Sequence, residues 1–319
     1  MSNDLAVTHN AAELLRREDL LAAFAAFLRL NVAEGDASAA TVRTYWSQVR
    51  QYVAWCRERG LDPALASEHD LLEYRAWLAE RYTRATVATK LAAVRRLYQA
   101  AVWRGMRADN PAAGLKAPKE KTAREERVKF LPLEGLKRLL QAPQGDGAKG
   151  RRDRAMLALM GVHGLRVSEV AGLDVDDLDL DQGRVTVTGK GRKTRTVYLT
   201  EQTAQALAAW LEARDRVAAE DEPALFVSLR HPDPGTRMSA RSIRYLVDGY
   251  LERLGLKGEG ISCHSLRHSA ATWARAGGAA LDAIAGMLGH SSVTTTQVYA
   301  RIVDRMTENP ARYLEALLG

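Results

Sequence analysis

Apolar residues recur at helical spacing through the first third of the chain, and this periodicity limits what the region can fold into. Four such stretches precede the Asn110-Pro111 pair, a helix-breaking signal; they cover residues 20–30, residues 39–59, a stretch that begins after Ser67, and residues 84–104. A period of 3.6 residues with one apolar face indicates amphipathic helices that pack on each other. We therefore expect a bundle of four helices over residues 1–115.

Residues 184–199 carry a different pattern, because apolar and polar residues alternate on both sides of a tight turn. A period of two is typical of a half-buried strand, and the central Gly191-Arg192 pair fits a hairpin turn that takes glycine first. Helical patterns flank this hairpin, over residues 133–141, 151–162, 201–219, 239–254, 265–276 and 281–288, with a last helix from Pro310. Strands and helices do not alternate, so we expect an α+β domain, mainly helical with a small antiparallel sheet, over residues 130–319.

A charged segment, residues 116–129, separates the two regions. It lacks apolar periodicity and contains Pro118, which is typical of a linker between domains. A chain of 319 residues is also longer than most single domains. The sequence therefore predicts a multidomain, mainly α protein with the boundaries 1–115, 116–129 and 130–319.

Charge and cysteine content narrow the setting in which the chain works. The net charge of +7 and the pI near 9.5 favour a polyanionic partner, since each phosphate neutralised by Lys or Arg releases a counterion. Two cysteines in a chain of this length favour a reducing compartment over a disulfide framework. The longest apolar run, around residues 155–162, is too short to span a bilayer, and the first residues carry no signal-peptide pattern. We expect a cytoplasmic protein without membrane contact.

Four segments hold side chains suited to chemistry: GLRVSEV (164–170), VTGKGRKTR (187–195), HSLRH (264–268) and LGHSSVTTTQVY (288–299). Taken singly, each has an ordinary explanation. Arg166 could form a surface ion pair with Glu169, the lysines could simply flank a turn, and Tyr299 could be a half-buried aromatic residue. The order and spacing of the whole set carry more information than any one member.

Together these segments resemble the tyrosine recombinase/integrase family, most closely its bacterial Xer-type members. The family signature is Arg, Lys, His-x-x-Arg, His and Tyr in that order, and the chain supplies it as Arg166, Lys190, His264, Arg267, His290 and Tyr299. The similarity runs from about Leu20 to the C-terminus. It implies an N-terminal SAM-like core-binding bundle, a catalytic domain, and an enzyme that cleaves and rejoins DNA through a 3′-phosphotyrosine intermediate.

The residue types suit attack on a phosphodiester. Arg166 and Arg267 are expected to clamp the phosphate, because guanidinium groups bind its oxygens bidentately and stabilise the added charge of the transition state. Tyr299 is mostly protonated at neutral pH, and His264 is the residue that we expect to take its proton. His290 is expected to hydrogen-bond the phosphate oxygens.

The leaving 5′ oxygen needs a proton donor, and the resemblance assigns this role to Lys190 in the hairpin turn. Lys193 lies across the same turn and stays an alternative. Glu169, one helical turn after Arg166, is expected to orient the clamp and the general base. Because the arginines supply the positive charge, the resemblance implies no metal or other cofactor.

Local signals indicate how the nucleophile is held. Gly289 is expected to end the helix before it, and Ser262 to cap the helix that carries the His-x-x-Arg motif. Thr294 and Gln297 fit a capping box for a short helix. Tyr299 is expected on that helix, brought to the site by the intervening turn.

The implied partner is double-stranded DNA, gripped by both domains. On the bundle we expect four exposed cations to contact it, although a solvated face explains each as well: Arg43, Lys90, Arg95 and Arg96. Four protomers, identical or of two kinds, would exchange strands through a Holliday junction, and the tail over residues 307–319 would dock on a neighbouring protomer. A second recombinase or a DNA translocase could be a further partner, and action on DNA implies association with the nucleoid.

The resemblance leaves several functions open. Xer-type resolution of chromosome or plasmid dimers and DNA integration both fit. The alternatives are a phage- or transposon-type integrase, a type IB topoisomerase with the same chemistry, and a non-catalytic DNA-binding protein of recombinase descent. The bundle and the His264-x-x-Arg267 block argue against the topoisomerase, and the complete set of six residues argues against the non-catalytic protein.

Overall fold

The computed structural model describes residues 18–32, 38–119, 122–189, 193–290 and 292–307. The chain divides into two compact units, residues 1–121 and 122–319. The helical bundle belongs to the first unit, and the mixed region belongs to the second. Each unit is described here by itself.

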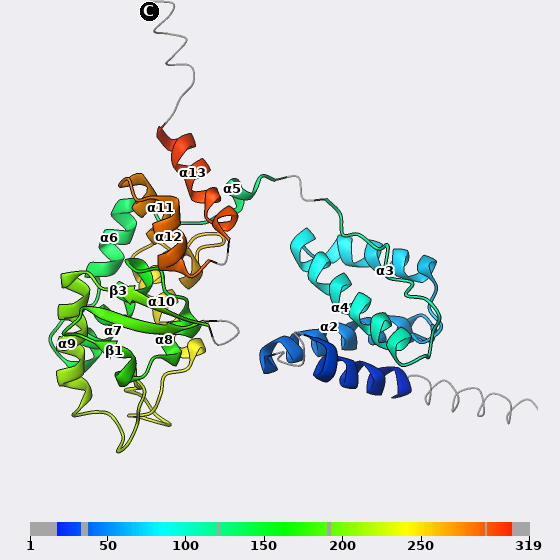
Figure 1. Ribbon diagram of the computed structural model, residues 1–319, viewed down its shortest axis with the longest axis horizontal. Helices are drawn as coiled ribbons and strands as arrows, with labels where there is room; N and C mark the ends of the chain where they lie inside the picture. Colours follow the sequence, from blue (N-terminus) through cyan, green and yellow to red (C-terminus); the bar gives the residue numbers. More distant parts are fainter. Residues whose placement is uncertain (1–17, 33–37, 120–121, 190–192, 291, 308–319) are drawn as a thin grey trace, which may run out of the picture. The chain divides into compact units, whose positions relative to one another are not determined.

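The first unit is built from helices alone within its described residues. A helix over residues 18–31 precedes three labelled ones, α2 (Ala39–Glu58), α3 (Glu68–Arg81) and α4 (Arg84–Trp103), and α4 packs against both α2 and α3 (Figure 1). The side chains of Ser38, Ser67 and Thr83 cap α2, α3 and α4 by accepting a hydrogen bond from a first-turn backbone N–H. The four predicted helices are therefore confirmed.

An aromatic cluster fills the core of this unit. Tyr52, Trp55, Tyr74 and Tyr98 are fully or almost fully buried, and their rings stack or meet edge to face. The hydroxyls of Tyr52 and Tyr98 lie 2.6 Å apart, and Tyr98 donates to the Pro63 carbonyl at 2.8 Å. Because these buried hydroxyls bond one another and the backbone, the core fixes how α2 and α4 lie together.

The second unit mixes helices with one small sheet. Its helices are α5 (Arg124–Arg127), α6 (Leu133–Gln141), α7 (Ala148–Gly161), α8 (Val167–Gly172), α9 (Glu201–Arg214), α10 (Ala240–Arg253), α11 (Cys263–Ala276), α12 (Leu281–Leu288) and α13 (Gln297–Thr307), with short 3-10 turns η2 (Val175–Asp177) and η4 (Val293–Thr295). Its strands are β1 (Leu178–Asp179), β2 (Arg184–Thr188) and β3 (Thr194–Tyr198). The predicted α+β class, mainly helical, is confirmed.

The sheet is antiparallel with the strand order β1-β2-β3. Val185 pairs with Val197 and Val187 with Arg195, so the two predicted strands and their antiparallel pairing are confirmed. The register differs by one residue from the prediction, because a two-residue turn centred on Gly191-Arg192 would pair Val187 with Thr196. Val185, Val187 and Val197 are buried, as the alternation requires. The turn predicted at Gly191-Arg192 lies outside the described residues, and β1 is a short addition that the alternation did not predict.

Two helices of this unit differ in length from the sequence prediction. The helix expected from residue 151 begins at Ala148, where Lys149 reaches the buried Asp153 one turn later, with 3.0 Å between Nζ and Oδ2. The helix expected to reach residue 219 ends at Arg214, whose guanidinium donates to the carbonyls of Glu222 and Ala224. Contacts with residues elsewhere in the fold determine where α7 begins and where α9 ends, and local periodicity does not predict such contacts.

Helix α11 is the centre of the second unit, since it contacts α6, α7, α10, α12 and α13, while α7 and α9 lie side by side (Figure 1). A large apolar core lies under the sheet and around α7, and a smaller one joins α11, α12 and α13. Residues on α11 can therefore reach both the α7–α8 side and the α13 side. Within the described residues, no helix is both long and apolar enough to cross a membrane.

Candidate active site

Arg166 stands at the N-cap of α8 and is held by the carboxylate one turn further on. Its backbone N–H donates to Glu169 Oε2 at 2.8 Å, and its side-chain Nη1 donates to Glu169 Oε1 at 2.8 Å. The Arg166 side chain keeps 38% of its surface exposed, whereas that of Glu169 keeps 3%. A buried acceptor therefore fixes a partly open cation.

Arg195, on β3, approaches the same carboxylate from the other side. Its Nη1 and Nη2 donate to the two oxygens of Glu169 at 2.9 and 3.0 Å, and its Nε donates to the Met287 carbonyl at the end of α12 at 3.2 Å. Burial alone would raise the pKa of Glu169. The hydrogen bonds from Arg195 and the Arg166 backbone outweigh burial, so the pKa of Glu169 lies below its ordinary value and the group is ionised.

Arg267, on α11, is 2% exposed and is anchored by the backbone. Nη1 donates to the Gly164 carbonyl at 2.7 Å and Nη2 to the Leu288 carbonyl at 2.5 Å, which leaves other N–H groups of the guanidinium available. Burial, followed by repulsion from Arg166, lowers the pKa of Arg267 to about 10, so it stays charged at neutral pH. Gly164 has a φ of +65°, and a Cβ there would lie 2.6 Å from a Leu288 methyl group, so only glycine fits.

The two predicted clamp arginines line one cavity. Its volume is about 170 Å³, and its walls are residues 165–168 together with Cys263, His264 and Arg267. Ser262 caps α11 at this point, as predicted: its side chain accepts from the His264 backbone N–H at 3.3 Å. A helix N-terminus and two guanidinium groups therefore converge on a space that suits an anion.

Tyr299 and the histidines lie beside this cavity. The Tyr299 hydroxyl is 2.8 Å from His268 Nδ1, and the His268 ring meets the His264 ring edge to face at 4.6 Å between centroids. His290 Nδ1 lies 2.9 Å from the Thr296 hydroxyl. The partner of the nucleophile in this structure is thus His268, one turn after His264, and not His264 as the sequence predicted.

The charge balance around these rings keeps them neutral. Burial, with added repulsion from nearby cations, lowers the pKa of His268 and of His290 to about 4, and burial followed by Arg267 and Arg166 lowers that of His264. Burial raises the pKa of Tyr299, although the arginines partly oppose this. At neutral pH the phenol keeps its proton, and with the ring proton on Nε2 the hydroxyl donates to His268 Nδ1.

Tyr299 is 2% exposed and packs among apolar side chains of α11, α12 and α13. It lies on α13, as predicted, and Gly289 ends α12 with a φ of +66°. The capping box predicted at Thr294 and Gln297 is wrong in detail, because Ser292 caps η4 instead, with its side chain accepting from the Thr294 N–H at 3.3 Å. In this arrangement the nucleophile does not line the cavity of the two arginines.

Helix α5 ties the segment expected to be a linker to the helix of the nucleophile. Glu125 accepts from Arg301 at 2.9 Å, and Glu126 from Arg305 at 3.1 Å, so two ion pairs join α5 to α13. Arg124 belongs to the same turn and contributes, after burial and two other arginines, to the lowered pKa of His290. Residues 122–129 of this segment therefore belong to the second unit, whereas Ala117 packs against the core of the first.

The hairpin lysines are only partly visible. Lys190 lies outside the described residues, and Lys193 is exposed at the base of β3, where its carbonyl accepts from the Gly189 N–H at 2.8 Å. A Cβ on Gly189 would lie 3.7 Å from Glu169 Oε1. The hairpin stem therefore runs beside the carboxylate that holds the arginines, and both lysines stay candidates for the proton donor.

On the first unit, the expected exposure of the four cations is wrong for Lys90. Its side chain is buried on α4, where Nζ donates to Gln48 Oε1 at 2.8 Å and to Gln51, and lies 4.4 Å from the centre of the Tyr82 ring. Arg95 is half-buried, and its guanidinium donates to the Ala112 and Leu115 carbonyls.

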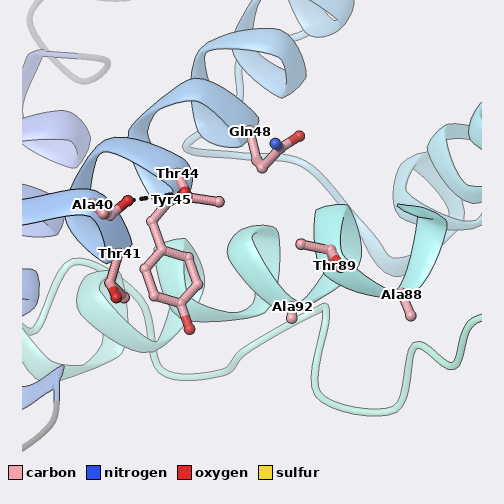
Figure 2. A pocket seen from close by; sticks show the side chains of 8 residues that line it. All are labelled: Ala40, Thr41, Thr44, Tyr45, Gln48, Ala88, Thr89 and Ala92. Carbon is pink, nitrogen blue, oxygen red and sulfur yellow. Dashed lines mark hydrogen bonds between the residues drawn. The ribbon is translucent and has the colours of Figure 1, made fainter. Parts of the chain in front are cut away.

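Arg43 is exposed, and Arg96 is half-buried with one bond to Gln99, so these two stay open to a partner. On the side of α4 that carries Arg96, α2 and α4 form an open groove of about 570 Å³ (Figure 2). Small and hydroxyl-bearing side chains line it, with Thr44 donating to the Ala40 carbonyl at 2.9 Å: Ala40, Thr41, Thr44, Tyr45, Gln48, Ala88, Thr89 and Ala92.

Comparison with known proteins identifies the family of both parts of the chain. Residues 129–306 match the phage integrase family, and residues 23–105 match the N-terminal SAM-like domain of phage integrases. The chain is 38% identical over 283 residues to tyrosine recombinase XerC of Corynebacterium efficiens. The aligned region covers 88% of this chain and 85% of the relative. It is 40% identical over 219 residues to XerC of Neisseria gonorrhoeae, 68% of each chain.

The chain belongs to the phage integrase family of tyrosine recombinases.

Solved structures share the fold of this recombinase. XerH site-specific recombinase bound to palindromic difH substrate has a TM-score of 0.74 at 20% identity and covers 88% of this chain and 81% of its own. The Tn1549 transposon integrase in complex with a circular intermediate DNA has a TM-score of 0.69 at 18% identity, covering 88% and 94%. At such identities the likeness shows the fold alone.

Three groups in the recombinase were missed by sequence reasoning. The sequence analysis assigns no role to His268, and it includes Arg195 only as the end of the hairpin motif. On α10, Arg241 and Arg244 are exposed close to α8, with Arg241 donating to the Tyr245 hydroxyl at 3.0 Å. His268 could have been found from its place one helical turn after His264. The others carry no local signal.

Proposed function

We propose that this recombinase cleaves and rejoins double-stranded DNA at specific sites, with Tyr299 as the nucleophile. The observation that carries the proposal is the convergence of Arg166, Arg267 and the capped N-terminus of α11 on one cavity. Next to this cavity, the hydroxyl of Tyr299 is hydrogen-bonded to a neutral histidine. Transfer of a phosphodiester to a tyrosine needs these groups: cations to bind the phosphate, a nucleophile and a base to take its proton. Family membership and the Xer-type relatives support the same reaction.

The phosphate would enter the arginine cavity. Arg166 is held by a single side-chain hydrogen bond and Arg267 by one bond from each terminal nitrogen, so both keep N–H donors for phosphate oxygens. Because the arginines are fixed before the substrate arrives, little reorganisation is needed as charge builds up in the transition state. His290, neutral and at the same site, would add one more hydrogen bond.

His268 would take the Tyr299 proton. Its pKa of about 4 keeps the ring unprotonated at neutral pH, and its Nδ1 lies 2.8 Å from the hydroxyl, where the Nε2-protonated tautomer accepts the hydrogen bond. The Tyr299 oxygen then bonds to phosphorus while the bond to the 5′ oxygen breaks. Lys190, by resemblance, or Lys193 would protonate that oxygen, and reversal of the steps joins the strands without ATP.

Tyr299 must move for this reaction, because it is buried and lies outside the wall of the cavity. It rides on α13, which is connected to α12 by the turn that contains His290 and η4. We expect DNA to draw α13 towards the arginines, so that the hydroxyl exchanges its apolar surroundings for the phosphate.

The bundle would contact the duplex through the α2–α4 side. Hydroxyls and an amide line its groove, and such groups can bond base edges or phosphates. Arg96 follows Thr89 and Ala92 at helical spacing, on the same side of α4. Arg43 lies on another side of α2, and Lys90 and Arg95 serve the bundle itself. On the second unit, Arg241 and Arg244 are further candidates for phosphate contacts.

Strand exchange needs more than one protomer. We propose a tetramer on two duplexes that passes through a Holliday junction, with the tail after residue 307, outside the described residues, docking on a neighbour. The XerC relatives favour dimer resolution by a Xer-type system over integration. A second recombinase or a translocase would then be the expected partner, with action at the nucleoid in the cytoplasm.

The test is to map covalent adducts on fragmented chromosomal DNA from the source organism. Wild-type protein should become attached to 3′ phosphates at a small number of sites, and Tyr299→Phe should bind the same fragments without attachment. Equal attachment by Tyr299→Phe would make another residue the nucleophile. Relaxation of supercoiled DNA without joining of paired sites would favour the topoisomerase alternative.

A further inference from the structure

The Glu169 carboxylate has more donors than one arginine needs. It receives one backbone and one side-chain hydrogen bond from Arg166 and two from Arg195. Its side chain is almost fully buried, so these protein groups must satisfy the charge. Arg195 takes one bond at each oxygen in the paired geometry that guanidinium and carboxylate groups prefer.

This pairing determines what Arg166 can do. If Glu169 had no second arginine, a bidentate pair with Arg166 would be its best arrangement, and that pair would occupy two of the clamp's nitrogens. With Arg195 in place, only Nη1 of Arg166 is used by Glu169. The Nε and Nη2 groups of Arg166 make no hydrogen bond within the described residues, and the Arg166 side chain lines the cavity.

Arg195 itself is not open to the substrate. All three of its nitrogens donate to the protein, and its side chain keeps 15% of its surface exposed. A third anchor comes from α12, through the Met287 carbonyl. Gly289 packs directly on the guanidinium stem, since a Cβ there would lie 2.9 Å from Arg195 Cδ. One side chain thus joins β3, α8 and the end of α12.

Resting on the proposed function, we propose that Arg195 is a positioning residue for DNA cleavage: by holding both oxygens of Glu169 it keeps the Arg166 guanidinium turned to the phosphate. It acts through Glu169 and does not touch the DNA. The assignment also accounts for a feature of the sheet, because Arg195 stands opposite the buried Val187 yet points its charge to the edge where α8 and α12 meet.

The experiment uses the full-length chain and a nicked duplex that carries a mapped cleavage site. Arg195→Met keeps the apolar stem and removes the donors. We expect its single-turnover cleavage rate at saturating DNA to fall by about 10- to 100-fold, the usual effect of removing a group that orients a reacting one. Its affinity for the duplex should stay within about threefold, because no DNA contact is lost.

Arg214→Met is the matched control. Arg214 is also a buried arginine that donates to backbone carbonyls, on α9 and away from the cavity. Its replacement should lower the thermal midpoint and leave the cleavage rate of the folded enzyme unchanged. If Arg195→Met behaves in the same way, Arg195 is structural and the inference is wrong.

A double-mutant comparison tests the route through Glu169. In a Glu169→Gln background, Arg195→Met should slow cleavage by less than about threefold, because the anion that Arg195 holds is already gone. An equal loss in both backgrounds would overturn the inference.

If Arg195→Met does not fold, Arg195→Lys replaces it. It keeps the charge but cannot bind both oxygens and Met287 at once, so a reduced rate at unchanged affinity is expected and a wild-type rate would contradict the inference. Wild-type protein that forms no adduct on any fragment would overturn the proposed function and this inference together. A normal wild-type adduct with an unaffected Arg195→Met would overturn the inference alone.

Discussion

The two units of the recombinase use their basic side chains in opposite ways. In the second unit, Arg166, Arg195 and Arg267 are tied to one carboxylate and to backbone carbonyls, and two of them line a cavity. In the bundle, Lys90 and Arg95 donate to amide and carbonyl oxygens, and these bonds hold the helices and the loop that follows α4. Fixed cations around a cavity prepare a site for an anion, whereas fixed cations without a cavity only stabilise a fold.

The largest effect is expected at Arg267. Arg267→Met should lower the single-turnover cleavage rate by about 10²–10³-fold, because a fixed donor to the phosphate is lost. The same change frees two buried carbonyls, Gly164 and Leu288, and should cost about 1–3 kcal/mol of unfolding free energy for each carbonyl left without a partner. Thermal unfolding and cleavage of a nicked duplex measure the two effects.

The comparison sharpens if Arg214→Met shows only the second effect, since both arginines hold carbonyls but Arg267 alone lines the cavity. A cleavage rate near wild type for folded Arg267→Met would contradict its role as a clamp.

His268 gives the next effect. His268→Gln should slow cleavage by about 10²-fold, the lower end of the usual contribution of a general base. In wild type the rate should stay constant from pH 8 to about pH 6, because the pKa of His268 is lowered to about 4 and the ring gains a proton only as the pH falls towards that value. A loss of rate centred near pH 6.5 would point to a histidine with an ordinary pKa, in contradiction to this assignment.

His163 offers a control in the same unit, because burial lowers its pKa to about 4 as well but its ring bonds Thr203 on α9 and not Tyr299. Its folded pKa lies below the unfolded value, so it destabilises the fold as the pH falls below about 6.5 and leaves stability unaffected above that. His163→Gln should therefore change acid stability and not the cleavage rate.

The features that the sequence could predict are those with a local signal or a fixed spacing, and the features that it could not predict depend on tertiary contacts. Helical periodicity and capping residues located all four helices of the bundle, and the motif order located Arg166 and Arg267, because each of these signals is local or fixed by spacing. The choice between His264 and His268 depends on how α13 rotates against α11, which no spacing encodes. The role of Arg195 depends on a carboxylate 26 positions earlier in the chain.

The burial of Lys90 shows the limit in the bundle. By helical spacing it was assigned to an exposed side of α4, but Gln48 and Gln51 on α2 supply oxygens and Tyr82 supplies a ring face for its charge. A lysine that finds such partners is buried despite its charge. A single-sequence pattern does not contain that information, because the two glutamines that accept from Lys90 are about 40 residues away.

Lys90→Met tests this interpretation with a moderate effect. Methionine matches the length of lysine but leaves the glutamine oxygens without their donor, so we expect a loss of about 1–2 kcal/mol in the stability of the bundle. Tryptophan fluorescence in urea reports mainly on that unit, since four of the six tryptophans lie there: Trp46, Trp55, Trp77 and Trp103. Cleavage at saturating DNA should not change. Unchanged stability with weakened DNA binding would return Lys90 to the DNA contacts that the sequence predicted.

The smallest effect is expected at Arg96, and it decides whether the bundle has any cation for DNA on the groove side. Arg96→Met should weaken binding of a duplex by a few fold and reduce the slope of log affinity against log salt by about 1, as the loss of one phosphate contact requires. Arg50 is the matched control, because it is exposed and lies on the far side of α2 from Thr44 and the groove. Equal slopes for Arg50→Met and Arg96→Met would mean that the groove does not face the duplex. A lower slope for Arg96→Met alone would place the groove against DNA and leave its hydroxyls and Gln48 as the groups that read the site.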